Sequence, residues 1–129
     1  MSTSTSRKAA RRQALYLLYQ WDLTGQELAS LYEGEPDAFA RALAEAVSTR
    51  ADDLDRRITA ASPDWPADRL GTLERNILRI GVYELEEHSV PREVAINEAV
   101  VLAKRYASED AARLVNGVLG KIAREEEAA

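Results

Sequence analysis

Apolar residues recur at helical spacing along most of the chain, and proline or glycine interrupts this pattern at only a few points. No stretch alternates apolar and polar residues for long enough to predict a strand. Ala, Leu, Glu and Arg dominate, and these residues favour helix. With 129 residues, 46% of them apolar, the chain can bury a core of its own. The sequence therefore predicts an all-α domain.

The breaks in the pattern set the expected helices. In the first half we expect a helix over 7–22 with the apolar stripe Ala10, Ala14, Leu17 and Trp21, a short helix over 26–33 and a long one over 36–60. In the second half we expect helices over 72–87, 91–106 and 108–124, with Pro91 and Ser108 at two of the helix starts. In the helix 91–106, Val94 and Val101 lie outside the main apolar arc, which predicts burial on two sides.

The strongest break is the run Ser62-Pro63-Asp64-Trp65-Pro66. We expect residues 7–61 to form an N-terminal three-helix bundle, 62–71 to connect the halves, and 72–124 to form a C-terminal three-helix bundle. The two bundles should pack together as one compact domain. Residues 1–6, rich in Ser and Thr, are expected to be a disordered tail, and the acidic residues 125–129 a frayed one.

Composition argues against several classes of function. The chain has no cysteine, which removes disulfides and thiol chemistry and fits a reducing compartment. A lone histidine, His88, cannot form a metal cluster, and no phosphate-binding loop or nucleophile elbow is present. No apolar run approaches the roughly 20 residues of a membrane span, and no secretory signal is present. We expect a cytoplasmic, non-enzymatic protein without cofactor or metal.

Four cations, Arg7, Lys8, Arg11 and Arg12, lie close together near the N-terminus, where residues 1–21 contain no acid. Because the whole chain has a net charge of −5, the remaining residues carry −9. Cations on a helix beside an aromatic such as Tyr19 can bind phosphates and stack on an unpaired base. The alternative, which spacing alone favours, is a solvated helix face with a partly buried tyrosine.

Two further features allow a structural or a functional interpretation. Glu74 and Glu84 fall inside the apolar arc of the helix 72–87, so each predicts either an internal ion pair or a surface completed by a partner's cation. Asn116 and Gly117 are poor helix formers within the last helix. They predict either a close helix crossing that only glycine permits or a close approach of RNA or a partner.

Several motifs, in order and nearly along the whole chain, resemble the NusB family of bacterial transcription antitermination factors. The similarity is weakest between about residues 27 and 60. The motifs are Arg11-x-x-Ala14, Leu18-Tyr19-x-Trp21, Ile77-Leu78-Arg79-Ile80 with Tyr83-Glu84-Leu85, Val90-Pro91, Val94-Ala95-Ile96-Asn97-Glu98-Ala99 with Leu102-Ala103-Lys104, and Val115-Asn116-Gly117-Val118-Leu119.

The resemblance implies an RNA-binding role. Proteins of this family bind single-stranded boxA RNA of ribosomal transcripts with the ribosomal protein NusE, within the antitermination complex of RNA polymerase. By the resemblance, phosphate contacts are expected from Arg7, Lys8, Arg11 and Arg12, and a second RNA surface from Asp110, Arg113 and Leu114. Asn116, a hydrogen-bonding residue of the same helix, is added to this surface from its own chemistry. The protein-partner face is expected at Tyr19, Asp68 and Glu74. Leu114 stands where an aromatic residue can occur in the family.

Two alternatives stay open. A similar helical domain occurs at the N-terminus of ribosomal RNA cytosine methyltransferases, where it serves as an RNA-binding module. We expect this chain not to be that enzyme, because no Rossmann-like segment follows the helices. The other alternative is a helical scaffold that forms a homodimer and uses its basic end only for solubility.

Overall fold

The computed structural model describes residues 6–128, and these residues contain helices and connecting segments but no strand. The all-α fold class is therefore confirmed. The first half contains α1 (Arg7–Thr24), the 3-10 turn η1 (Leu28–Leu31), α2 (Ala38–Thr49) and α3 (Ala51–Ala61). The second half contains the 3-10 turn η2 (Ala67–Arg69), α4 (Thr72–Glu87), α5 (Arg92–Tyr106) and α6 (Glu109–Ala128). Residues 1–5 and 129 of the two expected tails lie outside the described residues.

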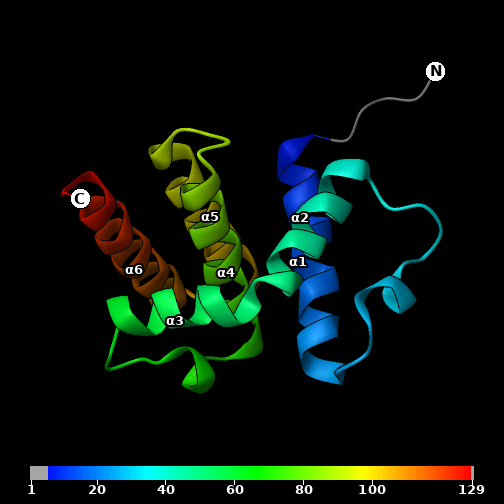
Figure 1. Cartoon of the computed structure of the whole chain (residues 1–129), viewed down its shortest axis with the longest axis horizontal. Coiled ribbons are helices and arrows are strands. Elements are labelled where there is room, and N and C mark those ends of the chain that lie inside the picture. The colour runs from blue at the N-terminus through cyan, green and yellow to red at the C-terminus, as the bar shows by residue number, and fades with distance from the viewer. Residues whose placement is uncertain (1–5, 129) are drawn as a thin grey trace.

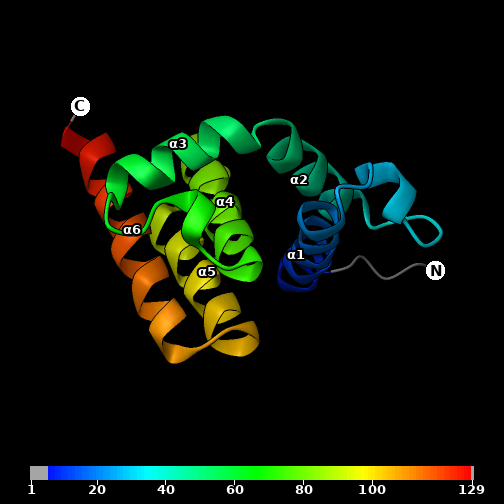
Figure 2. The same ribbon diagram turned by 90° about the horizontal axis from the view of Figure 1, so that it is seen from below.

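Helix α4 lies at the centre of the molecule and packs against all five other α-helices. On one side α4, α5 and α6 run next to one another, and on the other side α1 and α2 form a pair (Figure 1). Helix α3 lies across one end of α4 and α6, so part of the first half of the chain packs on the second half (Figure 2). The fully buried side chains come from several helices and include Leu18, Leu54, Ile58, Ile77, Leu78, Ile80, Leu85, Leu119 and Ile122.

The prediction of one long helix over 36–60 is wrong, because the chain turns at Arg50 and forms two helices, α2 and α3. Arg50 has φ −102° and ψ 13°, and its guanidinium bonds to Glu86 of α4 at 2.5 Å. The turn lets Leu54 and Ile58 point into the core while α3 crosses α4 and α6. The short helix expected over 26–33 is a single 3-10 turn.

The ends of the other helices follow local capping. Ser6, expected in the disordered tail, is ordered and caps α1 by accepting a hydrogen bond from the Ala9 backbone N–H at 3.1 Å. Ser108 caps α6 in the same way through Ala111, as predicted. Residues 125–128 were expected to fray, but they continue α6 to Ala128. Glu126 and Glu127 hold this last turn through ion pairs with Arg57 of α3 and Arg92 of α5.

Two packing predictions require correction. Val94 and Val101 are 39% and 43% exposed, because α5 packs only through its opposite face against α4 and α6. Gly117 does not mark a close helix crossing, since a Cβ atom there would meet nothing within 4 Å. The close crossing is at Gly81 of α4, where an added Cβ would lie 2.5 Å from Leu119 Cδ1 of α6.

A polar network joins α1, α3 and α4 inside the fold. One oxygen of Asp22 accepts hydrogen bonds from Arg75, Asn76 and Arg79 at 2.9–3.1 Å. Arg79 also donates two hydrogen bonds to Asp55 of α3, at 2.7 and 2.6 Å. Burial lowers the pKa of the Arg79 guanidinium, but its bonds to Asp55 and Asp22 outweigh this effect and leave the pKa raised. The guanidinium therefore stays charged, and its hydrogen bonds link α4 to α1 and α3.

No helix within residues 6–128 combines the length and the apolar character that crossing a membrane requires.

Candidate functional site

The basic residues of α1 point in different directions. Arg7 and Lys8 are exposed in the first turn, and Arg12 is half-buried one turn later. Lys8 forms an ion pair with Glu98 of α5 at 2.7 Å. Arg12 forms no ion pair with any of residues 6–128. The first turn of α1 contains no acid, so the positive charge adds to the positive end of the helix dipole.

Arg11 does not belong to this exposed set. Its side chain is 4% exposed and donates two hydrogen bonds of 2.8 Å to Glu84 of α4, which is equally buried. These hydrogen bonds raise the pKa of the Arg11 guanidinium. Arg11 is therefore removed from the residues expected to contact phosphate, because no phosphate can approach it without breaking the core pair. For Glu84, the internal ion pair is the interpretation that holds.

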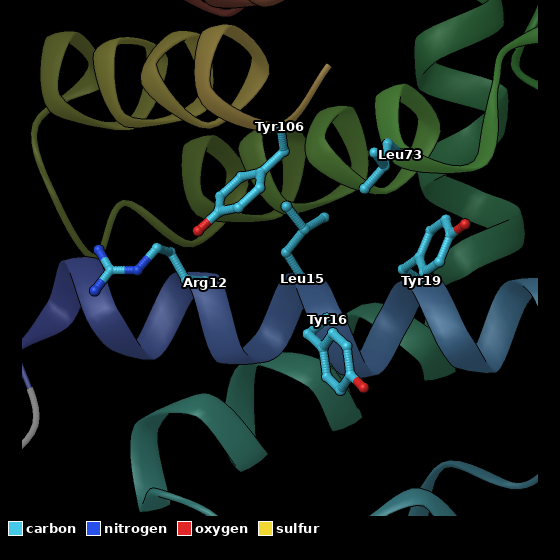
Figure 3. Close-up of a pocket in the computed structure, with 6 residues that line it drawn as sticks. All are labelled: Arg12, Leu15, Tyr16, Tyr19, Leu73 and Tyr106. Carbon is cyan, nitrogen blue, oxygen red and sulfur yellow. The ribbon is translucent and has the colours of Figure 1, made fainter.

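Arg12 belongs to a shallow pocket between α1, the start of α4 and the end of α5 (Figure 3). Three tyrosines also line this pocket: Tyr16 and Tyr19 follow Arg12 on α1, and Tyr106 ends α5 and is the one that lies nearest the Arg12 side chain in Figure 3. Tyr16 and Tyr106 are 57% and 40% exposed. An unpaired guanidinium near the accessible ring of Tyr106 is an arrangement that can bind a phosphate and stack on an unpaired base. Leu15 and Leu73 complete the lining.

The residues expected at the second RNA surface lie at the start of α6. Asp110 and Arg113 are exposed and form an ion pair with each other, and Leu114 is half-buried. Asn116 is exposed, and its neighbour Gly117 has open space around it. Asp110 and Leu114 line a wider groove whose other wall is the segment 65–71, with the 59% exposed ring of Trp65.

The three residues expected at the protein-partner face occupy three neighbouring places rather than one site. Tyr19 lines the Arg12 pocket, and Glu74 lines the groove beside Trp65 and Leu114. Asp68 is exposed on η2, where it lines a further hollow against α3. Glu74 is half-buried and has no hydrogen bond or ion pair with another described residue, unlike Glu84. Its interpretation as a partner-facing carboxylate stays a prediction.

Sequence reasoning missed three exposed aromatic residues at these surfaces: Tyr16, Tyr106 and Trp65. Tyr16 was detectable, because it lies four residues after Arg12 and so on the same helix face. Tyr106 and Trp65 reach their neighbours only through the packing of α5 and of the segment 62–71. Within residues 6–128, no three His, Cys, Asp or Glu side chains lie close enough together to hold a metal ion.

Comparison with known proteins agrees with this picture. Residues 8–124 match the model of the NusB family. The chain is 37% identical to the transcription antitermination protein NusB of Myxococcus xanthus, covering 92% of this chain and 94% of that protein. It is 40% identical to the NusB protein of Rubrobacter xylanophilus, covering 88% and 87%.

Solved structures give the same result. NusB of T. maritima superposes with a TM-score of 0.83 at 30% identity, over 95% of this chain and 94% of that one. A chain from a crystal structure of the antitermination factors NusB and NusE with double-stranded RNA superposes with a TM-score of 0.80 at 32% identity, over 92% and 96%. The family match covers most of the sequence, and the relatives share both its length and its helical fold. The chain therefore belongs to the NusB family.

Proposed function

We propose that this protein is a non-enzymatic transcription antitermination factor that binds the boxA element of nascent ribosomal RNA together with the ribosomal protein NusE. The observation that carries the proposal is the Arg12 pocket in a chain of this family, where an unpaired guanidinium lies near the exposed ring of Tyr106. The related structure of NusB and NusE with RNA supports both partners. The protein acts in the cytoplasm, as a component of the antitermination complex of RNA polymerase.

The RNA surface follows from the geometry of exposed groups. Arg7, Lys8 and Arg12 supply the positive charge, and Tyr16 and Tyr106 offer rings for stacking. Asp110, Arg113, Leu114 and Asn116 at the start of α6 extend this surface. Because the body of the chain is acidic, non-specific attraction to nucleic acid is weak and the basic end of α1 decides where RNA binds.

The partner surface lies beside the RNA surface. Tyr19, Asp68 and Glu74, which line three separate hollows, are the proposed contacts of NusE, and Tyr19 belongs to the same pocket as Arg12. A partner that contacts this edge can add its own RNA-binding groups next to Arg12. Binding of RNA and of NusE should therefore be coupled, each tightening the other by the same factor.

The test is the affinity of a short single-stranded boxA RNA and of a scrambled RNA at one fixed salt concentration, each with and without NusE. Wild-type protein and the Arg12→Glu variant are compared. The proposal predicts that boxA binds more tightly than the scrambled RNA, that NusE increases the difference, and that Arg12→Glu abolishes it. Lys121→Glu is the matched control, because Lys121 is an exposed cation of α6 with no part in the proposed surface.

Equal, weak binding of both RNAs with and without NusE would contradict the proposal. The alternative function, a helical scaffold, would then be the better explanation. Gel filtration would measure whether the chain forms the homodimer that this function requires. A dimer that boxA RNA dissociates into monomers would instead support the RNA-binding proposal, since the two states would compete for one surface.

A further inference from the structure

Arg7 is held flat against an aromatic ring. Its guanidinium carbon lies 4.0 Å from the centroid of the Phe39 ring, which belongs to the first turn of α2. This is the shortest of the five cation–π contacts among the described residues. Arg7 is exposed and forms no ion pair with any described residue, whereas its neighbour Lys8 is paired with Glu98. One face of the guanidinium therefore rests on Phe39, and the other is open.

The ring of Phe39 is also one wall of a groove between α2 and the end of α4. The groove holds about 190 Å³, and the half-buried ring of Tyr83 forms its opposite side. Burial raises the pKa of the Tyr83 phenol, so the ring stays neutral at physiological pH. Glu87 and Ser89 supply polar groups at the rim, and Glu84 in the wall is neutralised by Arg11. The groove is thus largely apolar and aromatic, with a few hydrogen-bonding groups and a free cation beside it.

The position of Arg7 has an electrostatic cost. A cation in the first turn of a helix opposes the helix dipole, and no acid of the same turn compensates it. An anion bound next to Arg7 would remove this cost. The Arg7 cation selects an anionic ligand, and the flat guanidinium, supported by the Phe39 ring, favours a planar ring stacked on it. A nucleotide of a single-stranded RNA combines both properties in one unit.

We propose that Arg7, held over the Phe39 ring beside the Tyr83 groove, forms a separate binding site for one unpaired base of the RNA, which stacks on the outer face of Arg7 while its phosphate lies at the guanidinium edge. The proposal rests on the RNA-binding function proposed above. It gives Arg7 a role in holding a base rather than only in attracting the RNA backbone. The site lies on the α2 side of α1, whereas the Arg12 pocket lies between α1, α4 and α5.

The experiment is an abasic scan. A boxA RNA is made in versions that each lack one base but keep the backbone, and each is bound to the wild type, Phe39→Leu and Phe39→Ala. Loss of a stacked base weakens binding by roughly tenfold. At one position, removing the base should weaken binding to the wild type about tenfold but should not weaken binding to either Phe39 variant. The Phe39 variants should already bind the intact RNA about tenfold more weakly than the wild type does. All other positions should keep the wild-type penalties.

Phe39→Leu keeps an apolar side chain at this position and so guards against a variant that fails to fold, which melting temperatures check. Tyr32→Leu is the matched control, because Tyr32 also carries an arginine, Arg41, over its ring at 5.7 Å but lies outside the groove. Tyr32→Leu should leave every abasic penalty unchanged.

Two results would overturn the inference alone. The first is specific boxA binding in which the Phe39 variants show the same penalty as the wild type at every abasic position. The second is a loss of NusE affinity without RNA in Phe39→Leu, which would make the groove a protein contact. Failure of the wild type to distinguish boxA from scrambled RNA would instead overturn the proposed function, and this inference with it.

Discussion

Arg11 of α1 and Glu84 of α4 form a bidentate ion pair in the protein interior, with both hydrogen bonds at 2.8 Å and both side chains at most 4% exposed. The pair joins the helix that carries the proposed RNA surface to the central helix of the fold. The two neighbouring arginines of α1 therefore differ: Arg11 is paired in the core, whereas Arg12 lines a surface pocket and forms no ion pair with the described residues.

Replacing Arg11 by alanine is expected to lower the free energy of unfolding by about 3–5 kcal/mol, because the Glu84 carboxylate is then buried without a partner. Arg12→Ala should change it by less than about 0.5 kcal/mol. Urea unfolding followed by circular dichroism measures both variants. In the double variant Arg11→Met/Glu84→Leu, most of the stability should return, since no unpaired charge remains. Equal stability of Arg11→Ala and the wild type would show that the pair contributes nothing.

Arg79→Lys should destabilise the protein by about 1–3 kcal/mol although the charge is kept. A lysine cannot reproduce the two parallel hydrogen bonds to Asp55 together with those to Asp22 and Asn76. Arg56→Lys is the control, because Arg56 is an exposed residue whose ion pair with Asp53 lies within α3. Thermal melts of the two variants give the comparison, and a loss in Arg56→Lys as large as in Arg79→Lys would count against the network.

The two glycines Gly81 and Gly117 should respond in opposite ways to alanine. Gly81→Ala places a Cβ 2.5 Å from Leu119 Cδ1, and Leu119 is fully buried, so a loss of about 1–3 kcal/mol is expected. Gly117→Ala meets no atom within 4 Å and should stabilise α6 by up to about 1 kcal/mol. If Gly117→Ala also weakened RNA binding, Gly117 would be a point of close RNA approach. A lower free energy of unfolding in Gly117→Ala would contradict the open space around Gly117.

Arg12→Gln should weaken RNA binding and reduce the slope of log affinity against log salt by about 1, because one phosphate contact is lost. Tyr16→Leu should weaken binding without changing that slope, because a stacking ring carries no charge. Titrations of one boxA RNA at four salt concentrations separate the two effects. An unchanged slope in Arg12→Gln would remove Arg12 from the phosphate contacts.

Much of the fold could be predicted because the helices carry their own start and stop signals. The helix 72–87 matches α4 at both ends, and Ser108 caps α6 as expected. The break at Arg50 was missed because neither proline nor glycine marks it. A weaker signal was present in Asp52 and Asp53, which lie in the first turn of α3, where acids favour a helix start.

The interior pair was only half predicted. The sequence marks Glu84 as an acid within an apolar arc, but its spacing also groups Arg11 with the exposed cations Arg7, Lys8 and Arg12. Arg11 precedes Leu15 by four residues and Leu18 by seven, so it lies on the same buried face of α1. Two opposite charges, each within an apolar arc, are candidates for one ion pair. By contrast, the grooves at Trp65 and Phe39 depend on how distant helices pack, which no local pattern encodes.

Read-through of a terminator tests the central claim most directly. Transcription is followed in a cell extract depleted of this protein, on templates whose leader contains boxA or a scrambled sequence. The proposed function predicts that adding the purified wild-type protein restores read-through on the boxA template alone, and that Arg12→Glu, although folded, does not. Read-through that is the same with and without the protein, or the same on both templates, would contradict it.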